Sequence, residues 1–318
     1  MMGLLSYLVF FLIIAAIFAI VCLGLNLQWG YTGLFNIGIA GFFSVGAYTY
    51  AILAGPHHAA RLGSFGVPFL PAVALSMVAA GLAALLVGLP TLRLRDDYLA
   101  IATIGIASSI QLVASNERWL TGGTQGAQNI VQPLAGTFSS SLQYNLFFLA
   151  MMLVFVAVVY LALERMVHSP WGRVLMAIRE DETAASSLGK NAFSYRLQSF
   201  VIGSMVMGLG GALYASFITF ISPEDFLPVL TFQIWAMLIV GGSGSNLGAI
   251  VGAVLVWGLW TASGSLAQMV LPADLQVKGG AFQIVLIGLV LMVVLIFRPR
   301  GLFGSRKALV SHGAKTPE

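Results

Sequence analysis

Long apolar segments recur along the chain, separated by short polar or charged segments. A bilayer core about 30 Å thick is crossed by a helix of roughly 20 mostly apolar residues. Most of the apolar segments approach that length, so the pattern predicts an all-α polytopic membrane protein with about nine transmembrane helices. The predicted spans cover residues 4–25, 30–54, 68–92, 99–115, 145–163, 199–221, 230–242, 247–265 and 280–297.

The seventh predicted span, 230–242, is shorter than a bilayer requires. We interpret it as a half-helix or re-entrant segment, which is stable at membrane depth only where protein or a water-filled cavity surrounds it. The connections between spans leave no room for a separately folded soluble domain. Residues 1–318 are therefore predicted to form a single transmembrane domain.

Basic residues predict the orientation, because lysine and arginine favour cytoplasmic loops. Of the 15 basic residues, the nine spans leave only Arg61, Arg118 and Lys278 on one side. The other side then carries the connection 164–198 and the tail 298–318, so both are predicted to be cytoplasmic and the N-terminus to lie outside. The twelve residues on this side are Arg93, Arg95, Arg165, Arg173, Arg179, Lys190, Arg196, Arg298, Arg300, Arg306, Lys307 and Lys315.

Charge is scarce in this sequence. Only 8% of the residues are charged, against about 25% in a soluble domain. None of the predicted spans contains Asp, Glu, Lys or Arg, whereas proton relays and voltage sensors depend on such residues. We infer that the driving energy enters from outside the spans. Sodium coupling through the backbone carbonyls of broken helices is the alternative.

Several other chemistries are not predicted. The single cysteine, Cys22, lies in the first span and has no disulfide partner within the chain. His57 and His58 lack further ligands at metal-binding spacing, and no paired intramembrane carboxylates suggest an enzyme. The basic residues form no face with interleaved aromatic residues, so nucleic acid is not an expected partner. The basic tail is expected to meet anionic lipid of the bilayer.

The longest cytoplasmic connection contains the clearest functional segment, residues 169–189. Ser169 can cap a helix whose first residue is Pro170. In that helix Ile178 shares an apolar face with its neighbours one turn back, while Arg173 and Arg179 reach water. This spacing predicts an amphipathic helix lying on the inner membrane surface.

A second short helix is predicted directly after the first. Asp181 or Glu182 favours its start, Ala184 and Ala185 allow another surface to approach closely, and Gly189 suits its end. Two such helices would form a docking platform; an ordinary charged loop is the other interpretation. The residues assigned to the platform are Arg173, Ile178, Arg179, Glu180, Asp181, Glu182, Ala184, Ala185 and Gly189.

The same segment resembles a known motif. Residues 182–189 are similar to the EAA loop of ABC importer permeases, with Thr183 where that pattern usually has Glu and an acidic residue one place earlier. Further likenesses surround it, and together they resemble the LivM-type permease of branched-chain amino acid ABC importers over nearly the whole chain. They are GYTG at 30–33, GAY at 46–48, LRLRDDY at 92–98, LTGG at 120–123 and FRPRGL at 297–302.

The resemblance implies an ABC importer permease bundle in a bacterial inner membrane. It implies a related LivH-type permease, two cytoplasmic ATPase subunits and a periplasmic substrate-binding protein as partners. Because the sequence lacks a GxxxxGK[ST] phosphate loop, ATP and magnesium are expected on the ATPase subunits, with no cofactor on this chain. The expected cargo is a branched-chain or other hydrophobic amino acid; a urea or amide importer is the nearest alternative.

Uncharged polar groups in the spans are candidates for the transport pathway. They could contact a passing substrate or simply join helices by hydrogen bonds. Glycines crowd the first half of the second span, where they allow either close helix packing or a break, and Gly244, Gly248 and Gly252 suggest a packing face. The pathway candidates are Thr32, Asn36, Ser44, Gln111, Ser115 and Gln233.

Overall fold

The computed structural model of the chain describes residues 2–55, 63, 65–94, 96–134, 136–138, 140–270, 279–298 and 301–304. Within these residues a helix lies at each of the nine predicted spans. These helices are α1 (Met2–Leu25), α2 (Ile39–Ala54), α3 (Phe69–Thr91), α4 (Asp96–Asn116), α6 (Ser141–His168), α9 (Ala192–Ile218), α10 (Pro228–Gly241), α11 (Asn246–Val270) and α13 (Gly279–Phe297).

Six of the described helices are long and apolar enough to cross a membrane: α1 with its continuation to Tyr31, α3, α4, α6, α9 and α11. Two others, α2 and α10, are shorter apolar helices. The 14 residues of α10 extend about 21 Å, less than a bilayer core, in agreement with the predicted short segment. The chain is thus a helical, multi-pass membrane protein, while the number of complete crossings stays a prediction.

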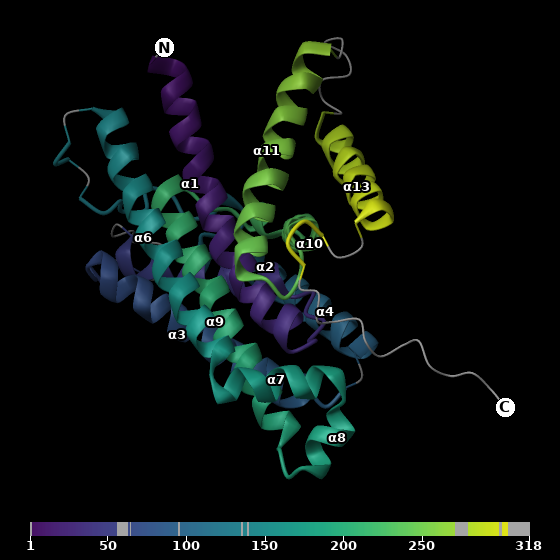
Figure 1. Cartoon of the computed structure of the whole chain (residues 1–318). Coiled ribbons are helices and arrows are strands. Elements are labelled where there is room, and N and C mark those ends of the chain that lie inside the picture. Colours follow the sequence, from purple (N-terminus) through teal and green to yellow (C-terminus); the bar gives the residue numbers. More distant parts are fainter. Residues whose placement is uncertain are drawn as a thin grey trace.

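Helix α9 lies at the centre of the bundle and packs against α1, α2 and α3 (Figure 1). Small residues permit this arrangement: a Cβ on Gly46 of α2 would overlap the backbone of Gly208 in α9. Most of α1 and α9 is buried, whereas α4 and α6 are largely exposed in the isolated chain. The core is therefore built around α1 and α9, with α4 and α6 at the periphery.

The second predicted span is interrupted. After α1 the chain continues as a π-helix, η1 (Asn26–Tyr31), and α2 begins only at Ile39. Residues 33–38 between them are not helical. Both interpretations of the glycines in this region hold, because the helix is broken before Ile39 while Gly46 packs closely on α9. We call residues 26–38 the interrupted segment.

Two helices extend beyond their predicted spans because polar residues cap them. Ser140 Oγ accepts a hydrogen bond from the Gln143 amide at the start of α6, and Asn191 Oδ1 accepts one from Ser194 at the start of α9. At its other end α6 continues past the predicted span, so that Glu164 and Arg165 lie in its last turns. The charge-free spans predicted from the sequence are therefore shorter than the helices that contain them.

The glycine repeat before and within α11 has two different roles. A Cβ on Gly248 or Gly252 would overlap the backbone of α10, so both provide the predicted close packing. Gly244 instead lies before the helix with φ of +82°, and its predicted place on the packing face is wrong. Residues 241–246, which link α10 to α11, form a turn that we call the glycine turn.

Smaller elements complete the described chain. They are α5 (Arg118–Thr121), η2 (Gly123–Gln125), α7 (Pro170–Glu180), α8 (Glu182–Ser187) and η3 (Pro223–Phe226). Helices α7 and α8 lie at the end of the bundle opposite the N-terminus (Figure 1). His57, His58, Arg95, Lys278 and most of the basic tail fall outside the described residues.

Candidate functional site

The platform predicted at 169–189 is formed by α7 and α8. Leu175 and Ile178 are buried on one face of α7, while Arg173 and Arg179 are exposed, as their spacing predicts. Pro170 is the first residue of α7. Ser169 occupies the position before it, but its hydroxyl donates to the Met166 carbonyl at 2.6 Å, so the predicted cap on α7 is not formed.

Helix α8 has the predicted ends. The Asp181 carboxylate accepts a hydrogen bond from the Ala184 amide at 2.9 Å and caps the helix. Gly189 follows the helix with φ of +79°, a conformation that favours glycine. Glu180, Asp181 and Glu182 are exposed, so the junction of the two helices presents three acidic side chains to solvent.

The two alanines of α8 face opposite ways. Ala184 is exposed, whereas Ala185 is buried against Ile178 and Ala192. Only Ala184 therefore offers a small side chain to a partner surface. Leu188, which the sequence analysis did not single out, is 81% exposed at the end of α8. Ala184 and Leu188 are four residues apart, so both exposed side chains lie on the same face of this short helical segment.

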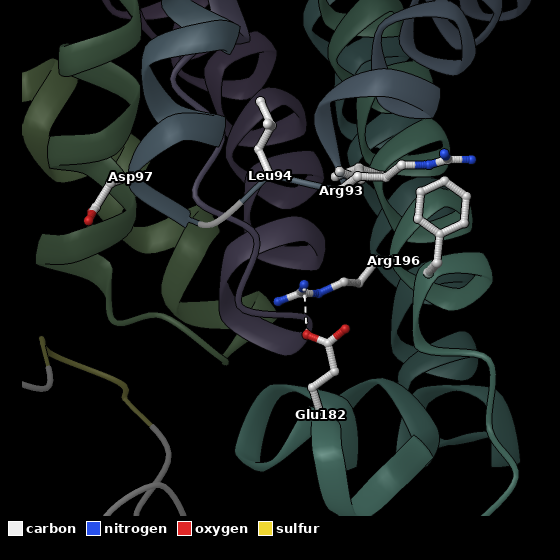
Figure 2. Close-up of a pocket in the computed structure, with 7 residues that line it drawn as sticks. Arg93, Leu94, Asp97, Glu182 and Arg196 are labelled. Carbon is white, nitrogen blue, oxygen red and sulfur yellow. Dashed lines mark ion pairs between the residues drawn. The ribbon is translucent and has the colours of Figure 1, made fainter. Parts of the chain in front are cut away.

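A cleft of about 800 Å³ adjoins the platform. Arg93 lies over the Phe193 ring, with 5.5 Å between the guanidinium carbon and the ring centroid. On the other side Glu182 of α8 forms an ion pair with Arg196 of α9 at 2.9 Å (Figure 2). The cleft thus connects the α3–α4 turn to α8 and α9. Its lining residues are Leu92, Arg93, Leu94, Asp97, Glu182, Phe193 and Arg196.

Two pathway candidates lie in the interrupted segment and are fully buried. The Thr32 hydroxyl donates to the Leu27 carbonyl at 2.9 Å and lies 2.6 Å from the Ser199 hydroxyl. The Asn36 amide nitrogen donates to Gln28 Oε1 at 2.8 Å. Both side chains therefore hold the segment in shape through hydrogen bonds within the protein.

Gln28 is the residue that the sequence analysis missed. It is fully buried in η1, and its amide nitrogen donates to the Phe200 carbonyl at 2.8 Å and to Ser204 Oγ at 3.1 Å, both in α9. Its oxygen accepts from Asn36. Gln28 thus joins the interrupted segment to the central helix. The only sign of Gln28 in the sequence was a polar residue between two apolar runs, and a polar residue at such a position is equally typical of a loop.

Helices α4 and α10 enclose the interrupted segment from other sides. The Ile37 amide donates to Thr103 Oγ1 of α4 at 3.0 Å, and the Trp235 indole of α10 donates to the Asn36 carbonyl at 3.0 Å. Trp235 also contacts Trp29 and Phe35, with ring centroids 5.3 and 5.0 Å away. Aromatic rings and neutral hydrogen-bonding groups therefore surround this segment.

The remaining pathway candidates lie elsewhere. The hydroxyl of Ser44 donates to the Gly41 carbonyl within α2, and that of Ser115 donates to the Gln111 carbonyl within α4. Gln111 and Ser115 are half-buried. Gln233 is buried in α10, and in the described structure its amide nitrogen has no hydrogen-bond partner. Gln233 is thus the pathway candidate here whose buried donor is available to a ligand.

Comparisons with known proteins find similar transport permeases. The family described as "Branched-chain amino acid transport system / permease component" matches residues 7–295. The high-affinity branched-chain amino acid transport system permease protein LivM of Escherichia coli is 32% identical over 307 residues, which are 90% of this chain and 67% of the relative. A probable LivM of Methanocaldococcus jannaschii is 29% identical over 75% of this chain and 76% of the relative.

More distant likeness extends to the autoinducer 2 import system permease protein LsrC of Yersinia pseudotuberculosis. That protein is 25% identical over 170 residues, covering 52% of this chain and 46% of the relative. No solved structure matches the chain.

Proposed function

The chain belongs to the family of branched-chain amino acid transport system permease components, and from this premise we propose that it forms part of the membrane pore of an ATP-driven importer. Its cargo is a branched-chain or other hydrophobic amino acid, which it moves into the cytoplasm. The single observation that carries the cargo assignment is the similarity to LivM over 90% of the chain.

The chemistry of the interrupted segment supports a zwitterionic or neutral cargo. Asn36 and Thr103 supply uncharged polar groups there, and Trp29 and Trp235 supply apolar surface. A charged side chain in such a low-dielectric setting would bind a cargo group of opposite charge tightly and slow its release. Neutral groups bind weakly, which suits passage, and leave selectivity to a separate substrate-binding protein outside the cell.

The platform supports the proposed ATPase partners. Helices α7 and α8 present exposed Ala184 and Leu188, while the buried face of the platform rests on α9. We assign this surface to docking of cytoplasmic ATPase subunits, which hold ATP and magnesium. A second, LivH-type permease completes the pore. In this arrangement ATP binding changes the relative affinity of the ATPases for two pore states.

The proposed orientation places the platform and residues 298–318 in the cytoplasm and the N-terminus outside, in a bacterial inner membrane. Exposed Arg173 and Arg179 on α7 support it, because basic residues concentrate on the cytoplasmic side. The position of the platform at the end opposite the N-terminus is consistent with this orientation (Figure 1).

The test reconstitutes this chain in proteoliposomes with its cognate permease, ATPases and binding protein, and measures uptake of labelled leucine. Uptake is expected to require ATP and every subunit. Concentrative uptake by the chain alone along a sodium gradient refutes the proposal in favour of a secondary carrier. Uptake of urea or an amide, but not leucine, refutes the cargo assignment alone.

A substitution tests the docking surface. Ala184→Trp is expected to lower ATPase binding and leucine uptake about tenfold, which corresponds to roughly 1.4 kcal/mol of lost binding. The matched control is Ala150→Trp, because Ala150 is also exposed but lies on α6. Equal assembly and uptake in both variants would reject α8 as the docking helix.

A further inference from the structure

One arginine of the platform reaches into the membrane domain. Arg179 lies in the last turn of α7, and its Nη1 donates to the carbonyl oxygen of Gly30 in η1. A Cβ on Gly33 would lie 3.1 Å from Cγ of Arg179, so the absence of a side chain at Gly33 makes room for the arginine. The stem of Arg179 thus lies over the interrupted segment, while the residue as a whole remains exposed.

The same guanidinium lies beside the glycine turn. A Cβ on Gly244 would be 3.9 Å from Arg179 Nη1 and 3.5 Å from the Gly30 carbonyl oxygen. Arg179 therefore contacts the interrupted segment at the point where it approaches the junction of α10 and α11. One side chain of the platform adjoins two non-helical connections of the bundle.

A chain of hydrogen bonds holds these connections together. Asn26 Oδ1 accepts from the Gly244 amide at 2.8 Å, and Asn26 Nδ2 donates to Asn246 Oδ1 at 2.9 Å. Asn246 Nδ2 in turn donates to Glu164 Oε2 of α6 at 2.7 Å. A displacement of η1 is therefore passed directly to the glycine turn and to the end of α6.

Residues 301–303 lie on the other side of the glycine turn. The amide of Leu302 donates to the Val240 carbonyl at 3.0 Å, and that of Phe303 donates to Gly241 at 2.9 Å. These bonds satisfy carbonyls at the end of α10 that the helix itself leaves free. Contacts with η1, α11 and residues 301–303 thus hold the glycine turn in place. Arg179 of the platform lies next to the same turn.

The interrupted segment also contains two of the pathway candidates, Thr32 and Asn36. Gln28 lies two residues before Gly30, and Asn36 bonds to Gln28 and to Trp235 of α10. A π-helix such as η1 is a rare local structure that often occurs at functional sites. The Gly30 carbonyl is thus two residues from Gln28, which is hydrogen-bonded to Asn36. A movement of this carbonyl would therefore change the surroundings of both side chains.

We propose that Arg179 is the positioning residue that transmits movement of the platform to the interrupted segment and the glycine turn. A guanidinium suits this role because it stays charged and holds a carbonyl through directional hydrogen bonds. The acceptor is favourable too, since carbonyls at the end of a helical segment carry partial negative charge. The inference rests on the proposed function, because it assumes that partner subunits move α7.

The test compares Arg179→Gln with wild type in the reconstituted importer and measures leucine uptake and ATP hydrolysis together. The expected result is at least a fivefold loss of leucine transported per ATP hydrolysed by the assembled complex, the lower end of about five- to 150-fold for coupling between sites. Arg179→Lys should recover part of this ratio, because an ammonium still donates to the carbonyl. The control is Arg165→Gln, an exposed arginine on α6.

A double-mutant cycle provides the second readout. Gly33→Ala forces a methyl group against the stem of Arg179 and should lower the transport ratio in wild type. In an Arg179→Ala background the same substitution should have at least a threefold smaller effect, because alanine lacks the Cγ atom that the methyl group would contact. The backbone strain from φ of +78° at Gly33 is the same in both backgrounds and cancels in the comparison.

The outcomes separate the two ideas. An unchanged ratio in Arg179→Gln, or a parallel loss of assembly, hydrolysis and uptake, overturns the transmitting role and leaves the proposed function intact. Additive effects of Gly33→Ala and Arg179→Ala overturn it as well. Failure of the wild-type complex to import leucine with ATP refutes the proposed function instead.

Discussion

Replacing Gln28 by leucine should destabilise the membrane domain measurably. Leucine keeps much of the volume of the fully buried glutamine but removes three hydrogen bonds, to Phe200, to Ser204 and from Asn36. Hydrogen bonds between membrane helices contribute about 0.6 kcal/mol each on average. Three such bonds give roughly 2 kcal/mol, and the Asn36 amide left without its acceptor adds to this loss.

The expected shift in melting temperature follows from the length of the chain. An unfolding entropy of about 2.1 cal/mol/K per residue over 318 residues gives roughly 0.67 kcal/mol/K. A loss of about 2 kcal/mol then lowers Tm by about 3 °C. The assay heats the detergent-solubilised chain and measures the fraction that remains monodisperse.

Gln143→Leu is the matched control, because Gln143 is exposed at the start of α6. Exposed substitutions generally change stability by less than about 0.5 kcal/mol, so its Tm should change by less than about 1 °C. A Gln28→Leu variant as stable as this control would refute the reasoning. It would mean that the bonds of Gln28 contribute nothing to the packing of the interrupted segment on α9.

Two further predictions concern α10. Gly252→Val should lower Tm by about 1.5 to 4.5 °C, because overpacking at the contact with α10 costs about 1–3 kcal/mol. The control is Gly288→Val in α13, where a Cβ has open space, and it should change Tm by less than about 1 °C in the same assay. Equal shifts in the two variants would contradict the close packing of Gly252 on α10. Trp235→Phe removes the hydrogen bond to the Asn36 carbonyl, worth about 1 kcal/mol, but keeps an aromatic ring against Trp29. Labelled leucine uptake should therefore fall severalfold with little loss of protein yield, and unchanged uptake would argue against a role for this bond.

The positions of the helices could be predicted because they depend on local information. An apolar run must form a helix in lipid, where every backbone polar group needs a partner within the segment. The ends were less predictable, because the caps at Ser140 and Asn191 lengthen α6 and α9 by several residues. In α8 the capping aspartate and the terminal glycine lie within one short segment, and its ends were predicted correctly.

The interior of the site could not be predicted because its contacts join residues far apart in sequence. Asn26 bonds to Asn246, and Gln28 bonds to Phe200 and Ser204. Before the chain folds, these residues are simply polar positions between apolar runs. The four-residue glycine period before α11 was also misleading, since Gly244 belongs to a turn and not to the helix face.

Glu164 shows how the energetic argument changes once the fold is known. The carboxylate lies within α6, beyond the predicted span, and accepts a hydrogen bond from Asn246 at 2.7 Å. Glu164 is connected to Gly244 through Asn246 and Asn26, and Arg179 lies beside the same Gly244, so both charged residues adjoin the glycine turn. The charged groups that contact this network thus come from the end that carries the platform. Under the proposed function, a movement applied to α7 displaces Arg179, and hydrogen bonds through Gly244, Asn26 and Asn246 connect the region that Arg179 contacts to Glu164.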